Sequence, residues 1–436
     1  MLNDTICAIS TALKEGAISI VRMSGEDSLS ILYAISDIKD IKPNHIVYGH
    51  IYDGDQMIDE VLVSYFEKGR SYTREDMIEI NCHGGVYVTR VILNLLLKKG
   101  CRLAEPGEFT RRAYLNGRID LSKADSVNDL IKAQNSVQAR SAIRGLNGSV
   151  ERLLMPLMEE MKDVISMIEV NIDYPEYEDE VQMSTEIVRP HLEKWIKDVK
   201  DMIDKAERFR VVKDGLDTVI IGKPNVGKSS LLNALLDADK AIVTDIAGTT
   251  RDLVEGKVVL QNITLNLIDT AGIRDTSEQI EQIGIRKTME AVEKADLIIL
   301  VVDASNITDE DEELMRKYQD RDLLVVYNKS DIKETGEISI SAKNKEIGKL
   351  VDYLNEKYKE DVSLADEDIL NNERQIALMK SCLNGLENME RNLDTNSMDL
   401  VVTDLDEAYH CLCQILGKEY QEELIDHMFR NFCLGK

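Results

Sequence analysis

The sequence of 436 residues contains little proline, and it lacks any apolar run long enough to span a membrane. Six prolines and 24 glycines exclude a collagen-like or low-complexity chain. A spanning helix needs roughly 20 consecutive apolar residues. The N-terminus also lacks a basic stretch leading into an apolar one, the pattern of an export signal. We therefore expect a soluble, cytoplasmic protein of several domains with no membrane partner.

Basic residues are also scarce. The chain has 53 Lys and Arg against 80 Asp and Glu, a formal net charge of −27. Because so acidic a protein repels polyanions, indiscriminate nucleic-acid binding is excluded. Residues 81–150 are the exception, with 11 basic and five acidic side chains and hence a net charge of +6. Within this stretch, Arg111, Arg112 and Arg118 are candidates for an anion-binding surface, although solvated positions are equally compatible with the pattern.

The cysteines do not form a disulfide framework, because their number is odd and they are scattered along the chain. We expect reduced thiols, as in a cytoplasm. His410, Cys411 and Cys413 might suggest a metal site. Their spacing lies within one helical pattern and has no second pair of ligands, so core packing is the favoured interpretation. The seven cysteines are Cys7, Cys82, Cys101, Cys382, Cys411, Cys413 and Cys433.

The first part of the chain, residues 1–118, is typical of a mixed α/β domain. β-Branched runs at 17–22 and 60–66 and the alternating run at 78–82 predict strands. Residues 86–99 predict a helix that ends at Gly100. From about residue 120 to 209, apolar residues recur at spacings of three and four, which predicts several helices. The acidic insert at 173–180 predicts one loop among them.

Residues 216–360 alternate buried strands with helical segments, as in a mostly parallel sheet. The strands are expected at 219–221, 265–268, 297–302 and 323–327. A helical pattern returns after residue 369. We therefore predict a multidomain α/β protein with a mixed α/β domain (1–118), an all-α domain in two parts (119–211 and 370–436) and an inserted α/β domain (212–369).

The inserted domain carries a phosphate-binding motif. The segment Gly222-Lys-Pro-Asn-Val-Gly-Lys-Ser229 matches G-x-x-x-x-G-K-[ST], with a strand before it and a helix after it. Such a loop points successive backbone N–H groups at phosphate oxygens, and the helix N-terminus favours negative charge. Lys228 is expected to reach the β- and γ-phosphates, and the Ser229 hydroxyl to ligate Mg²⁺. These features predict a P-loop NTPase domain of the Ras-like kind.

Four further motifs follow in the order of a GTPase. Gly248–Asp252 fits the first switch, with Thr250 as a second hydroxyl for Mg²⁺, and Asp269–Gly272 follows a strand. Asn328–Asp331 follows another strand, and Asp331 can accept hydrogen bonds from guanine N1–H and the 2-amino group, which adenine does not offer. Ser341–Lys343 completes the base side. The ordered set predicts GTP as the nucleotide.

The arrangement for hydrolysis departs from the common GTPase pattern. Gly272 is followed by Ile273, where many GTPases have a glutamine that orients water. Another group must then position water and offset the charge of the transition state. Asn225 can help to ligate a monovalent cation, and Glu281 can hold a water molecule. From the sequence alone, each of the two is equally compatible with a structural or solvated position.

The motifs together resemble a known family. The GTPase motifs are similar to those of the Era/Der branch. The stretches Ala17–Gly25, Ile80–Gly85, Pro106–Leu121 and the terminal Cys433-Leu-Gly-Lys436 narrow the resemblance to the MnmE (TrmE) family of tRNA-modification GTPases, along essentially the whole chain.

This resemblance implies an N-terminal domain that dimerises and binds a one-carbon donor, 5-formyl- or 5,10-methylene-tetrahydrofolate. It implies that the protein forms a heterotetramer with the flavoprotein MnmG. This complex would add a carboxymethylaminomethyl or aminomethyl group to C5 of the wobble uridine of tRNA. Potassium-dependent dimerisation of the GTPase domains would drive hydrolysis.

The resemblance also implies roles for individual residues. Arg22, Glu79 and Arg118 correspond to folate positions, Glu281 to a water-orienting catalytic residue and Cys433 to a cysteine needed for modification. Ser229 and Thr250 would hold Mg²⁺, and Asn225, Thr244, Ile246 and Thr249 would hold K⁺. GTP contacts are implied for Asn225, Val226, Gly227, Lys228, Ser229, Ser230, Thr244, Asp245, Ile246, Ala247, Gly248, Thr249, Thr250, Asp269, Thr270, Ala271, Gly272, Asn328, Lys329, Asp331, Ser341, Ala342 and Lys343.

Three places depart from the family pattern: Arg118 stands where Lys is usual, Arg74 where Gly is usual, and Thr11–Lys14 where a Pro/Gly-rich turn is usual. The alternative function is a ribosome-assembly GTPase of the Era or Der type. It predicts a basic RNA-binding module after the GTPase domain. Residues 361–436 instead hold 16 acidic against six basic side chains and lack a GXXG loop, which disfavours the alternative.

Overall fold

The computed structural model describes residues 4–174, 184–236, 254–260, 263–268, 292–395, 397–418, 428–429, 432 and 435. The chain divides into two compact units, one of residues 1–128 with 413–436 and one of residues 129–412. Each unit is described below by itself. No helix within the described ranges is long and apolar enough to cross a membrane.

Unit 1 is built on a six-stranded sheet of order β3-β4-β5-β2-β1-β6. Antiparallel pairing joins β3 to β4, β4 to β5, β5 to β2 and β2 to β1, whereas β1 and β6 are parallel. The strands are β1 (Ile6–Ile9), β2 (Ile18–Ser24), β3 (Ile46–Asp53), β4 (Gln56–Phe66), β5 (Met77–His83) and β6 (Arg102–Leu103). Helices α1 (Ser28–Ile35), α2 (Val86–Lys98) and α3 (Glu108–Leu115) complete the domain.

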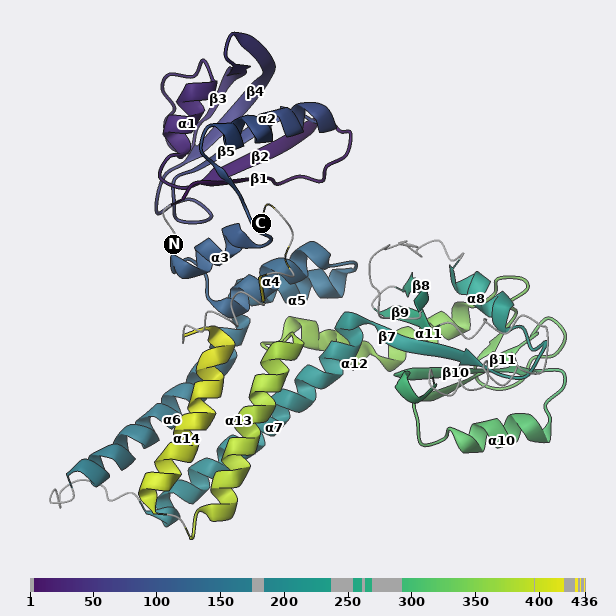
Figure 1. Ribbon diagram of the computed structural model, residues 1–436. Coiled ribbons are helices and arrows are strands. Elements are labelled where there is room, and N and C mark those ends of the chain that lie inside the picture. Colours follow the sequence, from purple (N-terminus) through teal and green to yellow (C-terminus); the bar gives the residue numbers. More distant parts are fainter. Residues whose placement is uncertain are drawn as a thin grey trace, which may run out of the picture. The chain divides into compact units, whose positions relative to one another are not determined.

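The core of this domain lies between the sheet and helices α1 and α2 (Figure 1). Alternate strand residues such as Val21, Val63 and Ile80 point into it, because successive side chains of a strand face opposite sides. The opposite face is covered at β1, where the buried Ile6 and Ala8 pack against Phe109 of α3, and is exposed over β3 and β4. Across it run Ile46, Ser64, Glu79 and Arg22 in one row, and Tyr48, Leu62, Asn81 and Ile20 in the next.

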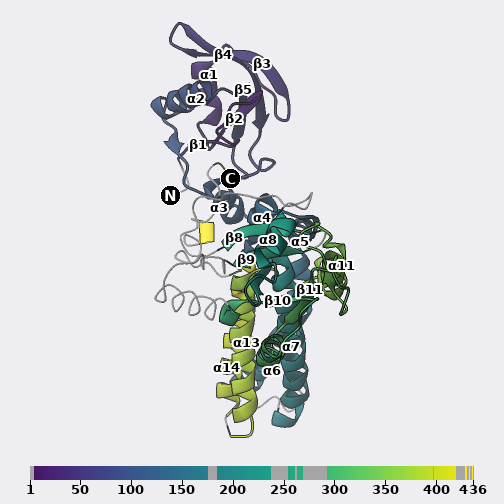
Figure 2. The same ribbon diagram turned by 90° about the vertical axis from the view of Figure 1, so that its right-hand side faces the viewer.

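Long helices form most of the remaining all-α part. Helices α6, α7, α13 and α14 run side by side in both views (Figures 1 and 2). Heptad-like apolar spacing buries Trp195 of α7 completely, and its indole Nε1 donates a hydrogen bond of 3.2 Å to Glu160 Oε2 of α6. The helices are α4 (Leu121–Lys132), α5 (Ser136–Leu146), α6 (Ser149–Asp173), α7 (Thr185–Asp214), α13 (Glu373–Asn392) and α14 (Met398–Leu416).

The chain leaves the helices at the end of α7 and returns at the start of α13. Lys213 joins these two chain connections: its Nζ donates a hydrogen bond to the backbone carbonyl of Asn371 and forms an ion pair of 2.7 Å with Asp129 Oδ2. Gln138 Nε2 donates in turn to the carbonyl of Lys213. An α/β domain is therefore inserted between two adjacent points of the helical part.

The inserted domain has a second six-stranded sheet, of order β12-β11-β10-β7-β9-β8. All its pairings are parallel except that of β8 with β9. The apolar runs make β10 and β7 buried central strands. Its strands are β7 (Leu216–Ile221), β8 (Val254–Val259), β9 (Thr264–Ile268), β10 (Leu297–Asp303), β11 (Leu323–Asn328) and β12 (Ser339–Ile340), with helices α8 (Lys228–Leu236), α10 (Asp309–Lys317), α11 (Gly348–Lys357), α12 (Lys359–Ser363) and the 3₁₀ turn η1 (Leu364–Asp366).

The predicted fold class is confirmed: a mixed α/β domain, an all-α domain and an inserted parallel α/β domain are all present. The predicted strands of both sheets and the helix from residue 86 are found, with Gly100 at a φ of 108° just after α2. The predicted loop at the acidic insert falls mainly on residues 175–183, outside the described part. The exact domain boundaries at 118, 211 and 369 stay predictions.

Candidate functional site

The phosphate-binding loop lies between β7 and α8, as the motif predicts. Its lysine, Lys228, donates hydrogen bonds from Nζ to the carbonyl oxygens of Gly222 (2.8 Å) and Lys223 (2.7 Å). Burial lowers the pKa of the Lys228 ammonium below its ordinary value. Ser229 and Ser230 lie exposed in the first turn of α8, where backbone N–H groups have no helical partners. The loop therefore has the donors that a polyphosphate requires.

Two glycines of the loop are required by its geometry. Gly222 has a φ of 143°, and a Cβ there would lie 2.3 Å from the carbonyl oxygen of Val301. Gly227 has a φ of 98°, and a Cβ there would lie 2.2 Å from Asn328 Nδ2. Asn225 is also left-handed, with a φ of 63°, a conformation that asparagine tolerates better than most residues. Its side chain is exposed beside the loop.

The base-side motif is bonded directly to the phosphate loop. Asn328, at the end of β11, donates from Nδ2 to the carbonyl of Val226 (2.8 Å) and accepts from the backbone N–H of Ala342 (3.0 Å). Asp331 accepts a hydrogen bond of 2.8 Å from Ser341 Oγ, and Lys329 pairs with Asp303 Oδ2 at 2.5 Å. Three motifs that are far apart in the sequence thus form one site at the carboxyl ends of β7 and β11, the usual place for ligands in such sheets.

Several predicted site residues are not part of the described structure. Because of this, the partners of Ser229 for Mg²⁺ and of Asn225 for K⁺ have no described geometry. The hydroxyl and amide oxygens of Ser229 and Asn225 fit these hard cations chemically. The residues outside the described ranges are Thr244, Asp245, Ile246, Ala247, Gly248, Thr249, Thr250, Asp269, Thr270, Ala271, Gly272, Glu281 and Cys433.

A second candidate site lies on the same face of the unit 1 sheet, next to α3. The guanidinium of Arg22 binds Glu79 Oε1 through Nε (2.9 Å) and Nη2 (2.7 Å). Arg118 donates to the carbonyl of Tyr72 (3.2 Å), and its guanidinium stands 4.6 Å from the centre of the Tyr72 ring. Arg22 lies 5.8 Å from the same ring. Two cations and an aromatic face thus converge on one place, a combination suited to a planar anionic ligand.

The C-terminal segment reaches this second site. The carbonyl of Gly435 accepts hydrogen bonds from Arg22 Nη1 and Ser10 Oγ, each of 3.2 Å. The family resemblance implied roles for Arg22, Glu79 and Arg118 but not for Tyr72, whose hydroxyl hydrogen-bonds with Thr110 Oγ1 at 2.9 Å. Burial raises the pKa of Tyr72. Whether this cluster binds a folate stays a prediction.

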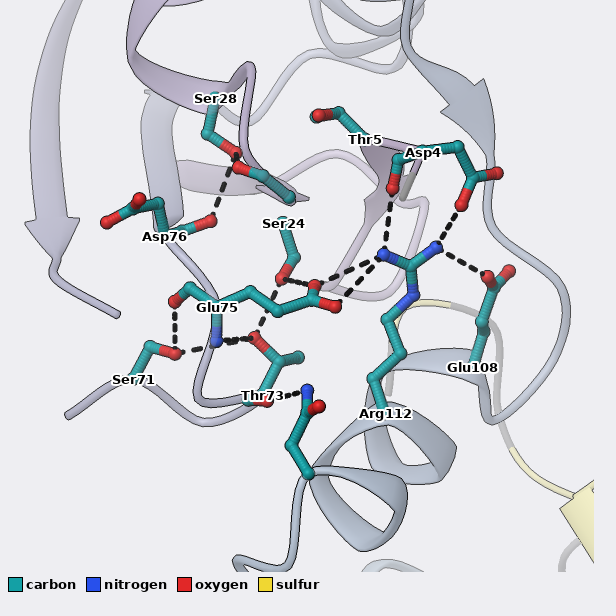
Figure 3. A network of polar contacts seen from close by, with 12 residues as sticks. Asp4, Thr5, Ser24, Ser28, Ser71, Thr73, Glu75, Asp76, Glu108 and Arg112 are labelled. Atoms are coloured by element: carbon teal, nitrogen blue, oxygen red, sulfur yellow. Dashed lines mark hydrogen bonds and ion pairs between the residues drawn. The ribbon is translucent and has the colours of Figure 1, made fainter. Parts of the chain in front are cut away.

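The turn that carries Tyr72 rests on a buried arginine (Figure 3). Arg112 is 1% exposed and donates to Glu75 Oε2 (3.1 Å), Asp4 Oδ1 (2.6 Å) and Glu108 Oε1 (3.1 Å). Glu75 is held further by Ser24 Oγ at 2.7 Å. Neither an anion-binding surface nor a solvated position is therefore correct for Arg112, because three carboxylates already surround it.

The remaining candidates from the sequence lie elsewhere. Cys413 is buried in α14, and Cys411 is half-buried in the same helix. The burial of Cys413 agrees with core packing. No group of three or more His, Cys, Asp or Glu side chains able to hold a metal ion occurs among the residues that the structure describes. Arg111 is half-buried.

The fold and the phosphate loop define a class of protein. A parallel sheet with a glycine-rich loop between β7 and α8, joined by Asn328 to the base-side motif, is the architecture of a P-loop GTPase. Comparison with known sequences narrows the class. Residues 5–118 match the family described as GTP-binding protein TrmE N-terminus, and residues 121–433 match the MnmE helical domain.

Curated relatives match over almost the full length. The tRNA modification GTPase MnmE of Streptococcus gordonii is 42% identical over 451 residues, which cover 99% of each chain. That of Lactococcus lactis subsp. cremoris is 42% identical over 448 residues, 99% of this chain and 98% of the relative. The chain belongs to the MnmE family of tRNA modification GTPases.

Solved structures resemble only part of the chain. An Era variant of Aquifex aeolicus bound to GDP·AlF4⁻ is 26% identical and covers 38% of this chain and 65% of its own, with a TM-score of 0.25. The G domain of the T. maritima FeoB iron transporter is 25% identical and covers 33% of this chain and 96% of its own, with a TM-score of 0.24. At such scores the family assignment depends on the sequence matches. Because those matches include the N-terminal and helical parts, a ribosome-assembly GTPase of the Era or Der type is not favoured.

Proposed function

We propose that this protein is the GTP-hydrolysing subunit of a cytoplasmic enzyme that modifies C5 of the wobble uridine of tRNA. The added group would be carboxymethylaminomethyl or aminomethyl, with a tetrahydrofolate derivative as one-carbon donor and the flavoprotein MnmG as partner. The observation that carries the proposal is the match to curated MnmE proteins along 99% of the chain. Nucleoside analysis of tRNA from a strain lacking the protein tests it.

In that experiment the wobble uridines should lose the modification and regain it when the wild-type gene is restored. A matched pair of variants sharpens the result. Lys228→Ala removes the ammonium of the phosphate loop and should not restore the modification. Lys359→Met removes an exposed lysine that pairs with Glu356 at 3.0 Å outside both candidate sites, and should restore it. Unchanged tRNA in the deletion strain would exclude the proposed reaction.

For hydrolysis, the chain's own residues bind and orient the nucleotide. Lys228 and the backbone N–H groups of the loop would hold the phosphates, Asp331 would select guanine, and Glu281 would orient water. Ser229 with Thr250 would hold Mg²⁺, and Asn225 with the backbone near Thr244 and Ile246 would hold K⁺. When bound, these cations supply positive charge at the phosphates.

Potassium dependence has a direct test. We expect faster GTP hydrolysis in potassium than in sodium at equal ionic strength. Asn225→Ala should remove the difference between the two salts while leaving the sodium rate close to that of the wild type. Equal wild-type rates in the two salts would contradict the potassium site and leave the GTPase assignment intact.

The second cluster is the proposed folate site. A pterin ring can stack on Tyr72, and Arg22 and Arg118 supply positive charge for its anionic tail, while Glu79 can accept hydrogen bonds from ring N–H groups. Arg118 replaces the usual lysine of the family and keeps the charge with a planar group. Calorimetry with 5-formyl-tetrahydrofolate should give binding to the wild type and none to the Arg22→Ala, Glu79→Ala double variant. Undiminished binding to the double variant would refute this site.

The exposed part of the first sheet, over β3 and β4, supports the proposed homodimer. Ile46 is 69% exposed and Tyr48 is 59% exposed, and both lie on the same face as Leu62. Contiguous exposed apolar side chains commonly mark an interface. Tyr48→Glu should therefore shift the sedimentation coefficient from that of a dimer toward that of a monomer, whereas Tyr87→Glu, at a more exposed position on helix α2, should not.

A further inference from the structure

The phosphate loop is anchored by a side chain that the motif does not specify. Lys223 occupies the first unspecified position of G-x-x-x-x-G-K-[ST], directly after Gly222. Its side chain leaves the loop and reaches the first turn of α10. There Nζ pairs with Asp311 Oδ2 at 2.6 Å and donates to Thr308 Oγ1 at 2.6 Å. Lys223 is 13% exposed and Asp311 is 0% exposed, so the ion pair is buried.

The receiving end of this pair is built into the helix start. Thr308 is the N-cap of α10, and Asp311 Oδ2 accepts from the backbone N–H of Thr308 (2.9 Å), which forms a capping box. A helix N-terminus is partially positive and alone would repel the Lys223 ammonium. The four acidic residues of the first turn, Asp309 to Glu312, supply negative charge that makes this end favourable for a lysine. The other carboxylate oxygen, Asp311 Oδ1, is buried with no hydrogen-bond partner among the described residues. The carboxylate is therefore directed to Lys223 and the cap.

The backbone of Lys223 also contacts Lys228, the phosphate-binding lysine of the loop. The carbonyl oxygen of Lys223 accepts one of the two loop hydrogen bonds of Lys228, at 2.7 Å. The neighbouring Gly222 lies against the carbonyl of Val301 on β10, and Val226 is held by Asn328. The loop is thus fixed to the sheet at Gly222 and Val226, and to α10 through the Lys223 side chain.

We propose that Lys223, through its ion pair with Asp311, is a positioning residue for GTP: it holds the amino-terminal arm of the phosphate loop in its nucleotide-binding shape. Residues 303–311 then connect both halves of the site, because Asp303 also pairs with Lys329 of the base-side motif. The inference rests on the assignment of this loop to GTP. It predicts that the ion pair controls nucleotide affinity.

The test uses the full-length protein and fluorescent mant-GDP. Lys223→Met should raise the Kd of mant-GDP and the KM for GTP about tenfold, with kcat changed less than about twofold, because a misplaced loop weakens binding before and during the reaction alike. Lys223→Arg retains the charge and should restore most of the affinity. Lys359→Met serves as the control and should bind as the wild type does.

A double variant separates positioning from stability. Lys223→Met with Asp311→Leu removes both buried charges, and such pairs can be replaced by apolar residues with little loss of stability. We expect its melting temperature to recover relative to Lys223→Met while its affinity for mant-GDP stays low. Wild-type affinity in the double variant would overturn the proposal. If the wild type itself did not bind mant-GDP, or if Lys228→Ala bound it as tightly as the wild type, the GTP assignment would fail instead.

Discussion

Replacement of Arg112 by leucine provides a quantitative test of how unit 1 is held together. Arg112 is surrounded by Asp4, Glu75 and Glu108, and its own side chain is 1% exposed. Asp4 and Glu108 retain a second partner, Arg102, in the variant. Glu75 keeps only hydroxyl donors such as Ser24. The variant therefore leaves a half-buried carboxylate without its cation.

The magnitude follows from this geometry. Removal of one partner of a buried ion pair costs about 3–5 kcal/mol. For a unit of this size, each kcal/mol lowers the melting temperature by about 2–4 °C, which gives a loss of roughly 6–20 °C for Arg112→Leu. Arg112→Leu combined with Glu75→Leu should recover about half of the loss, because no unpaired charge is then left in place. Arg90→Met, on the exposed side of α2, should change stability by less than about 0.5 kcal/mol.

The assay can observe the two units separately. The chain has one tryptophan, Trp195, which is buried in α7 of unit 2. Its fluorescence during urea unfolding reports that unit and should be unchanged in Arg112→Leu. Hydrogen exchange of peptides from β1, β2 and β5 reports unit 1 and should become faster. Unchanged exchange in those strands, or an equal shift of the tryptophan transition, would refute the reasoning.

Three further predictions concern single positions. Gly227→Ala places a Cβ against Asn328 at a φ of 98°, and should weaken mant-GDP binding roughly tenfold or more, whereas Gly348→Ala meets no atom within 4 Å and should bind normally. Burial, the largest single influence, raises the pKa of Glu108, but the hydrogen bonds from Arg102 and from the backbone N–H of Glu105, with the positive charges of Arg102 and Arg112, together hold the pKa below its ordinary value of 4.5. The Glu108 carboxylate therefore stabilises the fold above pH 4.5 and loses this effect as pH falls below it through the lowered pKa, so Glu108→Gln should flatten the acid limb of melting temperature against pH below about 4.5. Arg74 has a φ of 61°, so Arg74→Gly should be more stable than Arg74→Ala by about 1 kcal/mol in urea titrations, and an equal stability would exclude strain at this turn.

The phosphate loop could be predicted from the sequence because its determinants are local. About 15 consecutive positions contain a strand, two glycines that need a positive φ and the start of a helix. Each of these features has a known role in binding phosphate. The predicted strands of the first domain were also correct, since alternation is a local property. Alternation cannot show which face of the sheet is covered by helices α1 and α2.

The residues that sequence patterns missed depend on long-range contacts. Asp4, Glu75 and Glu108 converge on Arg112 only after the sheet has formed, so the positive stretch that includes Arg112 suggested a surface. Tyr72 gains its importance from Arg22 and Arg118, which lie 50 and 46 positions away in the chain. The buried partner of Lys223 is 88 positions away. No local pattern distinguishes such residues from ordinary turn or surface positions.

The hydrogen bond from Lys213 to Asn371 has a consequence for the order in which the protein folds. If the helices assembled first, they would have to close a loop of more than 150 residues, which costs about 4–5 kcal/mol of chain entropy. An α/β domain that folds first brings its own ends together and shortens this loop to a few residues. We therefore expect α7 and α13 to pair late, after the inserted sheet has formed. When that sheet is destabilised, the pairing of these two helices should be delayed more than any other.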